Sequence, residues 1–173
     1  MAALPPVLYS ESDIAERVAR LAKVLAALPS PPQVAAPVLV GAFVFAADLM
    51  RALARKGVPL ETEMLWLRSY GNARTGSAIS VLAAPSEHVR GKHVLLLDGV
   101  LDKGHTMLRA IALLREAGAA TITTVVAVDK HHPDAAAVAD YALYTGVHDF
   151  IVGYGMDDAG LYRSLPYIGK VEP

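Results

Sequence analysis

Residues 94–107 read VLLLDGVLDKGHTM, an apolar run that passes into an acidic, glycine-containing stretch and then into a helical pattern. The run predicts a buried parallel strand that ends as it reaches Asp98, and a second acid, Asp102, follows before Gly104. A strand–loop–helix junction directs backbone N–H groups and the positive end of a helix at an anion. The stretch therefore predicts a phosphate-binding loop, although an ordinary crossover with solvated acids would share much of this pattern.

The segments around this loop predict an α/β fold. Strands are expected at residues 93–97 and 121–128, and the second of them is rich in β-branched residues. A helix is expected between them, from His105 to Ala117, with Gly118 closing it. This is the spacing of a βαβ unit, which places the loop at the carboxyl end of the first strand.

Other elements follow from capping signals and apolar spacing. Ser10 and Asp13 have the spacing of a capping box that begins a helix, and a second helix is predicted from Phe43 to about Arg55. Strands are predicted at residues 37–40, 60–67, 79–82, 139–143 and 150–154, and an irregular tail at 157–173. The polar stretch 69–77 lies between two of these strands, so a β-ribbon or lid is expected there.

Composition removes several classes of function. A formal net charge of −1 gives no electrostatic reason for binding nucleic acid or an anionic membrane, and the chain has no cysteine for disulfides or thiolate chemistry. His131 and His132 are adjacent and so cannot point the same way, which disfavours a metal hydrolase. No signal peptide or apolar run of about 18 residues is evident, so we expect a cytoplasmic protein. The 173 residues are enough for one domain, expected to span 1–173.

The predicted loop offers specific groups to a sugar phosphate. The 5′-phosphate would meet the N–H groups of residues 103–106, that is Lys103, Gly104, His105 and Thr106, with the Thr106 hydroxyl as a further donor. Asp98 could accept from ribose hydroxyls or hold Mg²⁺ through water. Asp102 lies where a base attached to that ribose would be placed.

Four segments, in this order, resemble the hypoxanthine-type (6-oxopurine) phosphoribosyltransferases of the type I class. Arg68-Ser69-Tyr70 and the glycine-bearing loop after it are similar to that family's mobile catalytic lid. Residues 91–106 resemble its strand and loop for phosphoribosyl pyrophosphate (PRPP), and Asp129-Lys130 resembles its purine-reading pair. Residues 150–168, which begin FIVGYGMD, resemble its C-terminal purine hood. The resemblance covers nearly the whole chain.

The resemblance implies a mostly parallel central sheet flanked by helices, with a small hood formed by the chain ends. It implies purine salvage: transfer of the 5-phosphoribosyl group from PRPP to hypoxanthine or guanine, giving the purine nucleotides IMP or GMP and pyrophosphate. Mg²⁺ would be the cofactor and a homodimer or homotetramer the assembly. Asp102 would take or hold the purine N7 proton, and Ser69 and Tyr70 would close over the site and exclude water.

The same resemblance assigns the remaining site residues. On the purine side, Lys130 would donate to the 6-oxo group, Phe150 would stack on the base and Ile151 would present backbone groups to its edge. Asp157 would hold Mg²⁺, with Asp98 as a further candidate. The groups that would contact PRPP or its phosphates are Asp98, Lys103, Gly104, His105, Thr106, Gly41 and Arg163.

Three positions depart from the family's pattern. Gly99 stands where a second acid is usual, Val40-Gly41-Ala42 lacks the usual polar residue and glycine pair of the pyrophosphate loop, and Lys103 replaces a threonine or an acid. If each lost contact contributed about 1.5–3 kcal/mol, losing two would weaken PRPP binding by roughly two to four orders of magnitude. Two hypotheses follow: an active phosphoribosyltransferase, and a non-catalytic paralogue that binds a purine nucleotide as a sensor or regulator.

Overall fold

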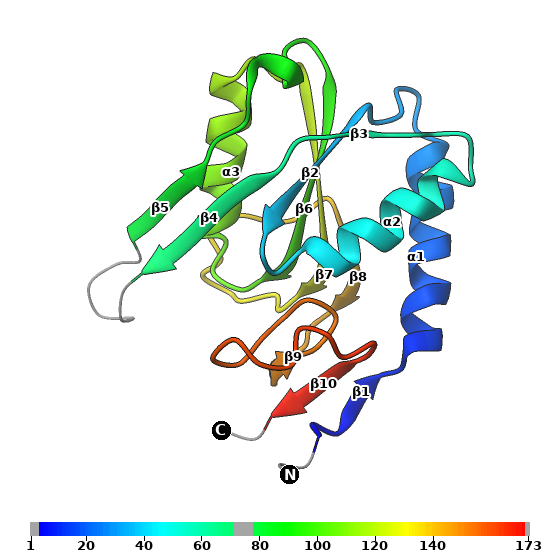
Figure 1. Ribbon diagram of the computed structural model, residues 1–173, viewed down its shortest axis with the longest axis vertical. Helices are drawn as coiled ribbons and strands as arrows, with labels where there is room; N and C mark the ends of the chain where they lie inside the picture. Colours follow the sequence, from blue (N-terminus) through cyan, green and yellow to red (C-terminus); the bar gives the residue numbers. More distant parts are fainter. Residues whose placement is uncertain (1–3, 71–77, 172–173) are drawn as a thin grey trace.

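The computed structural model describes residues 4–70 and 78–171 of the chain. Its main sheet has the strand order β5-β4-β2-β6-β7-β8, with the short β3 paired to β2 (Figure 1). The strands β2, β4, β6, β7 and β8 run parallel, and β5 is antiparallel to β4. The bounds are β2 (Val34–Leu39), β3 (Glu61–Thr62), β4 (Leu65–Tyr70), β5 (Ala78–Ala83), β6 (His93–Leu101), β7 (Thr121–Asp129) and β8 (Tyr141–Thr145).

The helices cover both faces of this sheet, as the α/β prediction requires. Alternate residues of β6 divide between two cores: Leu95 and Leu97 pack on the side of α1 and α2, whereas Val94 and Leu96 pack on the side of α3. Side chains of a strand alternate between faces, so a continuous apolar run is the pattern expected of a strand buried on both sides. The helices are α1 (Glu11–Ala26), α2 (Phe43–Ala54) and α3 (His105–Glu116), with a 3₁₀ turn at Glu87–Val89.

The strand β6 is longer than its sequence predicted. Pairing with β7 continues through Val100 and Leu101, which lie opposite Val128 and Asp129. The prediction that the strand ends before Asp98 is therefore wrong: Asp98 and Gly99 interrupt the apolar run without ending the hydrogen-bonded pairing. As a result Asp98 lies within the strand, and only residues 102–104 form the turn before α3.

Both ends of the chain meet in a small second sheet, which confirms the expected hood. The strands β1 (Val7–Tyr9) and β9 (Phe150–Val152) pair antiparallel with β10 (Ile168–Val171), which lies between them (Figure 1). The prediction that residues 157–173 form an irregular tail is therefore wrong, because β10 lies within them. The Tyr154 hydroxyl donates to Asp48 of α2 over 2.9 Å, so the segment after β9 is tied to the main body.

Local signals were reliable where they rest on capping. Ser10 and Asp13 form the predicted capping box, with each side chain bonded to the other residue's backbone N–H. Gly118 has φ +93°, a conformation that favours glycine at the end of a helix.

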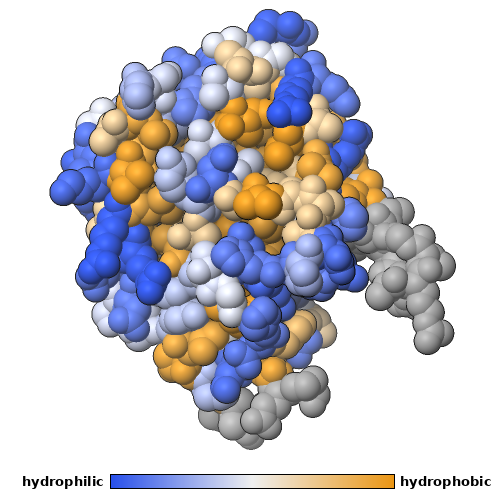
Figure 2. All heavy atoms as spheres, turned by 180° about the vertical axis from the view of Figure 1, so that it is seen from behind, coloured by the Kyte–Doolittle hydropathy of each residue, from blue (hydrophilic) through white to orange (hydrophobic). Residues whose placement is uncertain are grey.

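The surface on the side opposite to Figure 1 shows several separate apolar areas among hydrophilic side chains (Figure 2). No helix within residues 4–70 and 78–171 is long and apolar enough to cross a membrane.

We predict that Ser10→Ala lowers the free energy of unfolding by about 1 kcal/mol, because the α1 amide at Asp13 loses its side-chain acceptor. Urea unfolding followed by circular dichroism would measure the change. Ser10→Asn is the matched control, since Asn caps helices well and should keep most of the stability. Equal losses in the two variants would contradict a capping role.

Candidate active site

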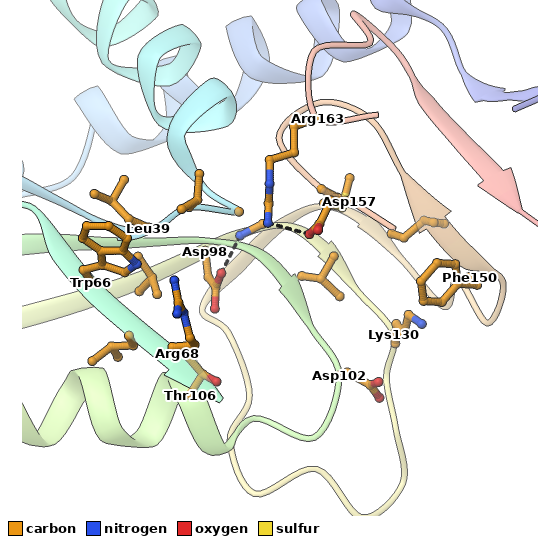
Figure 3. Close-up of a pocket in the computed structure, with 18 residues that line it drawn as sticks. Leu39, Trp66, Arg68, Asp98, Asp102, Thr106, Lys130, Phe150, Asp157 and Arg163 are labelled. Carbon is orange, nitrogen blue, oxygen red and sulfur yellow. Dashed lines mark hydrogen bonds and ion pairs between the residues drawn. The ribbon is translucent and has the colours of Figure 1, made fainter. Parts of the chain in front are cut away.

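The carboxyl ends of the central strands open into a cavity of about 590 Å³ (Figure 3). Its walls come from the ends of β2, β4 and β6, from the segment after β7, and from the hood. A smaller hollow of about 210 Å³ lies at the β6–α3 junction and shares part of the same wall. Ligands of open α/β sheets bind at this edge, because the loops and helix N-termini that follow the strands converge there. The residues common to both spaces are Asp98, Val100, Asp102 and Thr106.

The smaller hollow contains the predicted phosphate loop. Lys103, Gly104, His105 and Thr106 all line it, and α3 begins at His105. Gly104 adopts φ +77° and approaches Ala137 so closely that a Cβ would lie 2.7 Å from the Ala137 backbone nitrogen. Gly104 is the N-cap and makes no side-chain bond to the helix, so the first-turn N–H groups of α3 are not capped from within. This arrangement suits an anion such as a phosphate.

Asp98 is the acid of this cavity whose titration is most strongly altered. Burial raises the pKa of its carboxyl from 3.8 to about 7, while a 2.7 Å hydrogen bond from the Gly99 N–H to Oδ1 acts in the opposite direction. Figure 3 shows the side chain of Asp98 projecting from β6 into the cavity. A carboxyl group in this position would bind a cation or a ribose hydroxyl more strongly once it is ionised.

Asp157 and Arg163 form an ion pair on the hood side of the cavity (Figure 3). One guanidinium nitrogen of Arg163 lies 2.6 Å from Asp157 Oδ1, and the other terminal nitrogen donates to the Gly155 carbonyl over 2.7 Å. The second carboxylate oxygen of Asp157 accepts from the Gly160 N–H, also at 2.7 Å. Both side chains are therefore held in place while they still line the cavity. Their chemistry suits a bound polyphosphate, with a planar cation for the phosphate oxygens and an acid for its counterion.

Lys130, Phe150 and Ile151, the residues predicted to contact a purine, line the same cavity. Phe150 is 48% exposed, so its ring is not part of the buried core. Ile151 is buried, and the Lys130 backbone N–H bonds to the Leu101 carbonyl at 2.9 Å, which fixes the start of its loop. Figure 3 shows Lys130, Phe150 and Asp102 along the same part of the cavity. This part offers a ring face, a cation and an acid to a flat polar ligand.

The loop at residues 40–42 also forms part of the cavity wall. Val40 and Gly41 line the cavity, and the peptide bond between Leu39 and Val40 is cis. The Ala42 N–H donates to the Val38 carbonyl at 3.2 Å, and the Phe43 N–H donates to the Val40 carbonyl at 3.3 Å. These two amides are therefore used inside the loop, and Val40 and Gly41 are the loop residues that face the cavity.

Two further residues line the cavity: Trp66, which the sequence did not single out, and Arg68, which it indicated only as the start of the lid segment. Both lie on β4, and Figure 3 shows Arg68 projecting toward the cavity. A cation directly before the Ser69-Tyr70 pair is the signal that could have identified it. The backbone of Ser69 and Tyr70 lies at the end of β4, but their side chains and the predicted lid loop at 71–77 lie outside the described residues.

The carboxylates of the cavity determine what metal chemistry the residues can support. No group of three or more His, Cys, Asp or Glu side chains with the geometry of a metal site occurs among residues 4–70 and 78–171. Asp98 and Asp157 instead line the cavity from different elements. This donor set fits a magnesium ion, which proteins commonly bind through one or two carboxylates together with substrate phosphates and water.

These features define an α/β protein with a polar cavity at the carboxyl edge of a parallel sheet, whose lining would suit an anionic ligand. A family model described as phosphoribosyl transferase domain matches residues 8–159. The hypoxanthine phosphoribosyltransferase of Haemophilus influenzae is 32% identical over 173 residues, covering 95% of this chain and 94% of that protein. The bifunctional protein TilS/HprT of Listeria innocua is 32% identical over 96% of this chain, which spans only 26% of that longer protein.

A solved structure gives the same result for the fold. The hypoxanthine phosphoribosyltransferase from Trypanosoma cruzi, in complex with the product IMP, superposes with a TM-score of 0.85 at 30% identity and covers 96% of this chain and 94% of that one. The chain therefore belongs to the phosphoribosyltransferase family, and it has the type I fold of its hypoxanthine phosphoribosyltransferase relatives.

We predict that Asp98 gives the ligand-free protein a stability that falls as the pH rises from about 4 to about 7. In this window the unfolded chain has lost the Asp98 proton while the folded chain keeps it, because burial raises the folded pKa to about 7. The folded state then binds more protons, so the free energy of unfolding decreases with pH. Urea unfolding of the wild type and of Asp98→Asn, both with a metal chelator present, measures this effect. The free energy of unfolding of the wild type, relative to that of the variant, should decline as the pH rises through this window. Parallel pH profiles would contradict the shifted pKa.

Proposed function

We propose that this phosphoribosyltransferase acts in purine salvage, transferring the 5-phosphoribosyl group of PRPP to a 6-oxopurine, hypoxanthine or guanine, to give IMP or GMP and pyrophosphate. The observation that carries the proposal is the division of one cavity. Asp102, Lys130 and Phe150 line the part suited to a purine, while Asp157 and Arg163 line the part suited to pyrophosphate. The uncapped start of α3 adjoins both and suits the 5′-phosphate.

The purine end supports selection of the base by its exocyclic group. Lys130 carries a cation that can only donate hydrogen bonds, so a 6-oxo group satisfies it and a 6-amino group does not. Phe150, about half exposed, offers its ring to the purine face, and Ile151 places backbone groups at the base edge. This arrangement favours hypoxanthine and guanine over adenine.

The proposed reaction breaks the bond from ribose C1 to pyrophosphate as a purine nitrogen forms a new bond to that carbon. Asp102 accepts or holds the purine N7 proton, so that the leaving proton has an acceptor beside the base. Arg163 is a planar, permanently charged donor for the departing pyrophosphate, and Asp157 orients it through their ion pair. Ser69 and Tyr70 belong to the lid that, in the proposal, closes and excludes water.

Magnesium is the proposed cofactor, held by Asp157 and Asp98 together with substrate oxygens, where it would neutralise charge on the leaving pyrophosphate. The remaining PRPP contacts proposed are Gly41 in the loop before α2 and the loop residues Lys103, Gly104, His105 and Thr106.

We also propose a single domain over residues 1–173, a cytoplasmic location and a homodimer or homotetramer. Phe43 and Met64, 43% and 48% exposed, line an apolar hollow beside α2 that supports contact with a second copy.

The direct test is a spectrophotometric assay with PRPP, Mg²⁺ and each of hypoxanthine, guanine, xanthine and adenine. Turnover with a 6-oxopurine but little with adenine is expected. Nucleotide binding without any turnover, at every magnesium concentration, would instead support the non-catalytic paralogue.

We predict that Asp102→Asn lowers kcat by about 10²–10⁴-fold, because the amide cannot take the purine proton. Thermal stabilisation by IMP should remain, which separates lost chemistry from lost folding. Asp134→Asn, at an exposed position on the loop before β8, is the matched control and should keep wild-type turnover. An Asp102→Asn enzyme with undiminished kcat would remove Asp102 from the mechanism.

We predict that Lys130→Met raises the KM for hypoxanthine by roughly 10–100-fold, the loss expected for one hydrogen bond to a charged group. Discrimination against adenine should fall in the same variant, since the cation that opposes the 6-amino group is gone. Lys170→Met, at an exposed position of β10, controls for the loss of one positive charge. Unchanged base preference would show that another group reads the 6-position.

A further inference from the structure

The carbonyl of Gly41 is enclosed between two glycines that come from different parts of the chain. A Cβ built on Gly99 of β6 would lie 2.8 Å from the Gly41 carbonyl oxygen and 3.1 Å from its carbon. A Cβ on Gly155, which follows β9, would lie 2.5 Å from the same oxygen. Real Cβ atoms essentially never approach a neighbour to less than 3.0 Å. The carbonyl therefore occupies space that a side chain at either position would need.

The close contact excludes a side chain at Gly99 and Gly155, but it does not exclude one at Gly41. A Cβ built on Gly41 itself would meet nothing within 4 Å, so the loop residue has open space on its own side. At Gly99 the obstruction is backbone, which cannot move aside as the end of a flexible side chain can. The glycine at position 99 thus has a steric counterpart in the loop at 40–42, which also departs from the family's pattern.

We propose that Gly99 is a positioning residue: its lack of a side chain lets the Gly41 carbonyl pack against β6 and fixes residues 40–42 as the wall of the cavity at its pyrophosphate end. The departure at Gly99 is then linked to the loop at 40–42, because the Gly41 carbonyl occupies the volume where an acidic side chain would begin. The expected effect on PRPP binding rests on the proposed function. The packing of the Gly41 carbonyl against Gly99 does not depend on that function.

A positioning role for Gly99 and the simple loss of an acid predict opposite effects when an acid is restored at position 99. If Gly99 only removed a hydrogen-bond acceptor, Gly99→Asp would return the acceptor and tighten PRPP binding. If Gly99 positions the loop, any Cβ at this position displaces the Gly41 carbonyl, and Gly99→Asp and Gly99→Ala fail in the same way. The alanine variant isolates the steric effect, because it adds one methyl group and no charge.

The test measures KM separately for PRPP and for hypoxanthine in Gly99→Asp and Gly99→Ala. Both variants should raise the KM for PRPP by roughly tenfold, as expected for an overpacked contact, and change the KM for hypoxanthine by less than about twofold. A lower KM for PRPP in Gly99→Asp, or a neutral Gly99→Ala, would overturn the proposal. Equal changes for the two substrates would also overturn it, because the effect would then not be confined to one end of the cavity.

A second readout does not depend on turnover and so separates this proposal from the proposed function. Hydrogen exchange of the Ala42 and Phe43 amides, which bond to Val38 and Val40, should speed up in Gly99→Ala. Gly41→Ala is the control for folding alone, and its thermal stability should match the wild type because its Cβ enters open space. Unchanged exchange, or loss of the whole fold in Gly99→Ala, would contradict a role confined to residues 40–42. If the wild type were inactive but hydrogen exchange still became faster in Gly99→Ala, the proposed function would be refuted. The packing of the Gly41 carbonyl against Gly99 would still be supported.

Discussion

Parallel pairing of β6 between β2 and β7 is the constraint on which the site depends. Leu95 and Leu96 are fully buried on opposite faces of this strand, so β6 is held by apolar packing from both sides as well as by its two neighbours. Pairing in register fixes where each strand ends, and the loops that follow must begin at one edge. The groups proposed for catalysis lie on or after those strand ends, so the rigidity of the core determines the geometry of the cavity.

Much of the fold could be predicted from the sequence because its signals are local. The capping box of Ser10, the glycine that closes α3 at position 118 and the βαβ spacing around residues 102–104 each depend on a few neighbouring residues, and the structure confirms all three. The cavity also brings together the predicted Asp102, Lys130, Phe150, Asp157 and Arg163. Their convergence follows from topology once the strands are assigned correctly.

What the sequence could not provide depends on contacts between distant segments. The extent of β6 is set by pairing with β7, and the strand β10 is stabilised only when β1 and β9 are beside it. The raised pKa of Asp98 comes from burial, which no local pattern records. Gly99 looked like the loss of an acid, and only the 2.8 Å approach of the Gly41 carbonyl gives it a steric meaning.

The most direct test of the central claim is the reverse reaction, in which IMP and pyrophosphate are mixed with the enzyme and Mg²⁺ and the release of hypoxanthine is followed. This reaction requires the proposed nucleotide and pyrophosphate ends of the cavity to work together, and the departure at residues 40–42 lies at the proposed pyrophosphate end. We predict hypoxanthine release that depends on both pyrophosphate and magnesium, with PRPP formed in equal amount. Tight binding of IMP with no release at any pyrophosphate concentration would contradict the account and point to a protein that binds the nucleotide without acting on it.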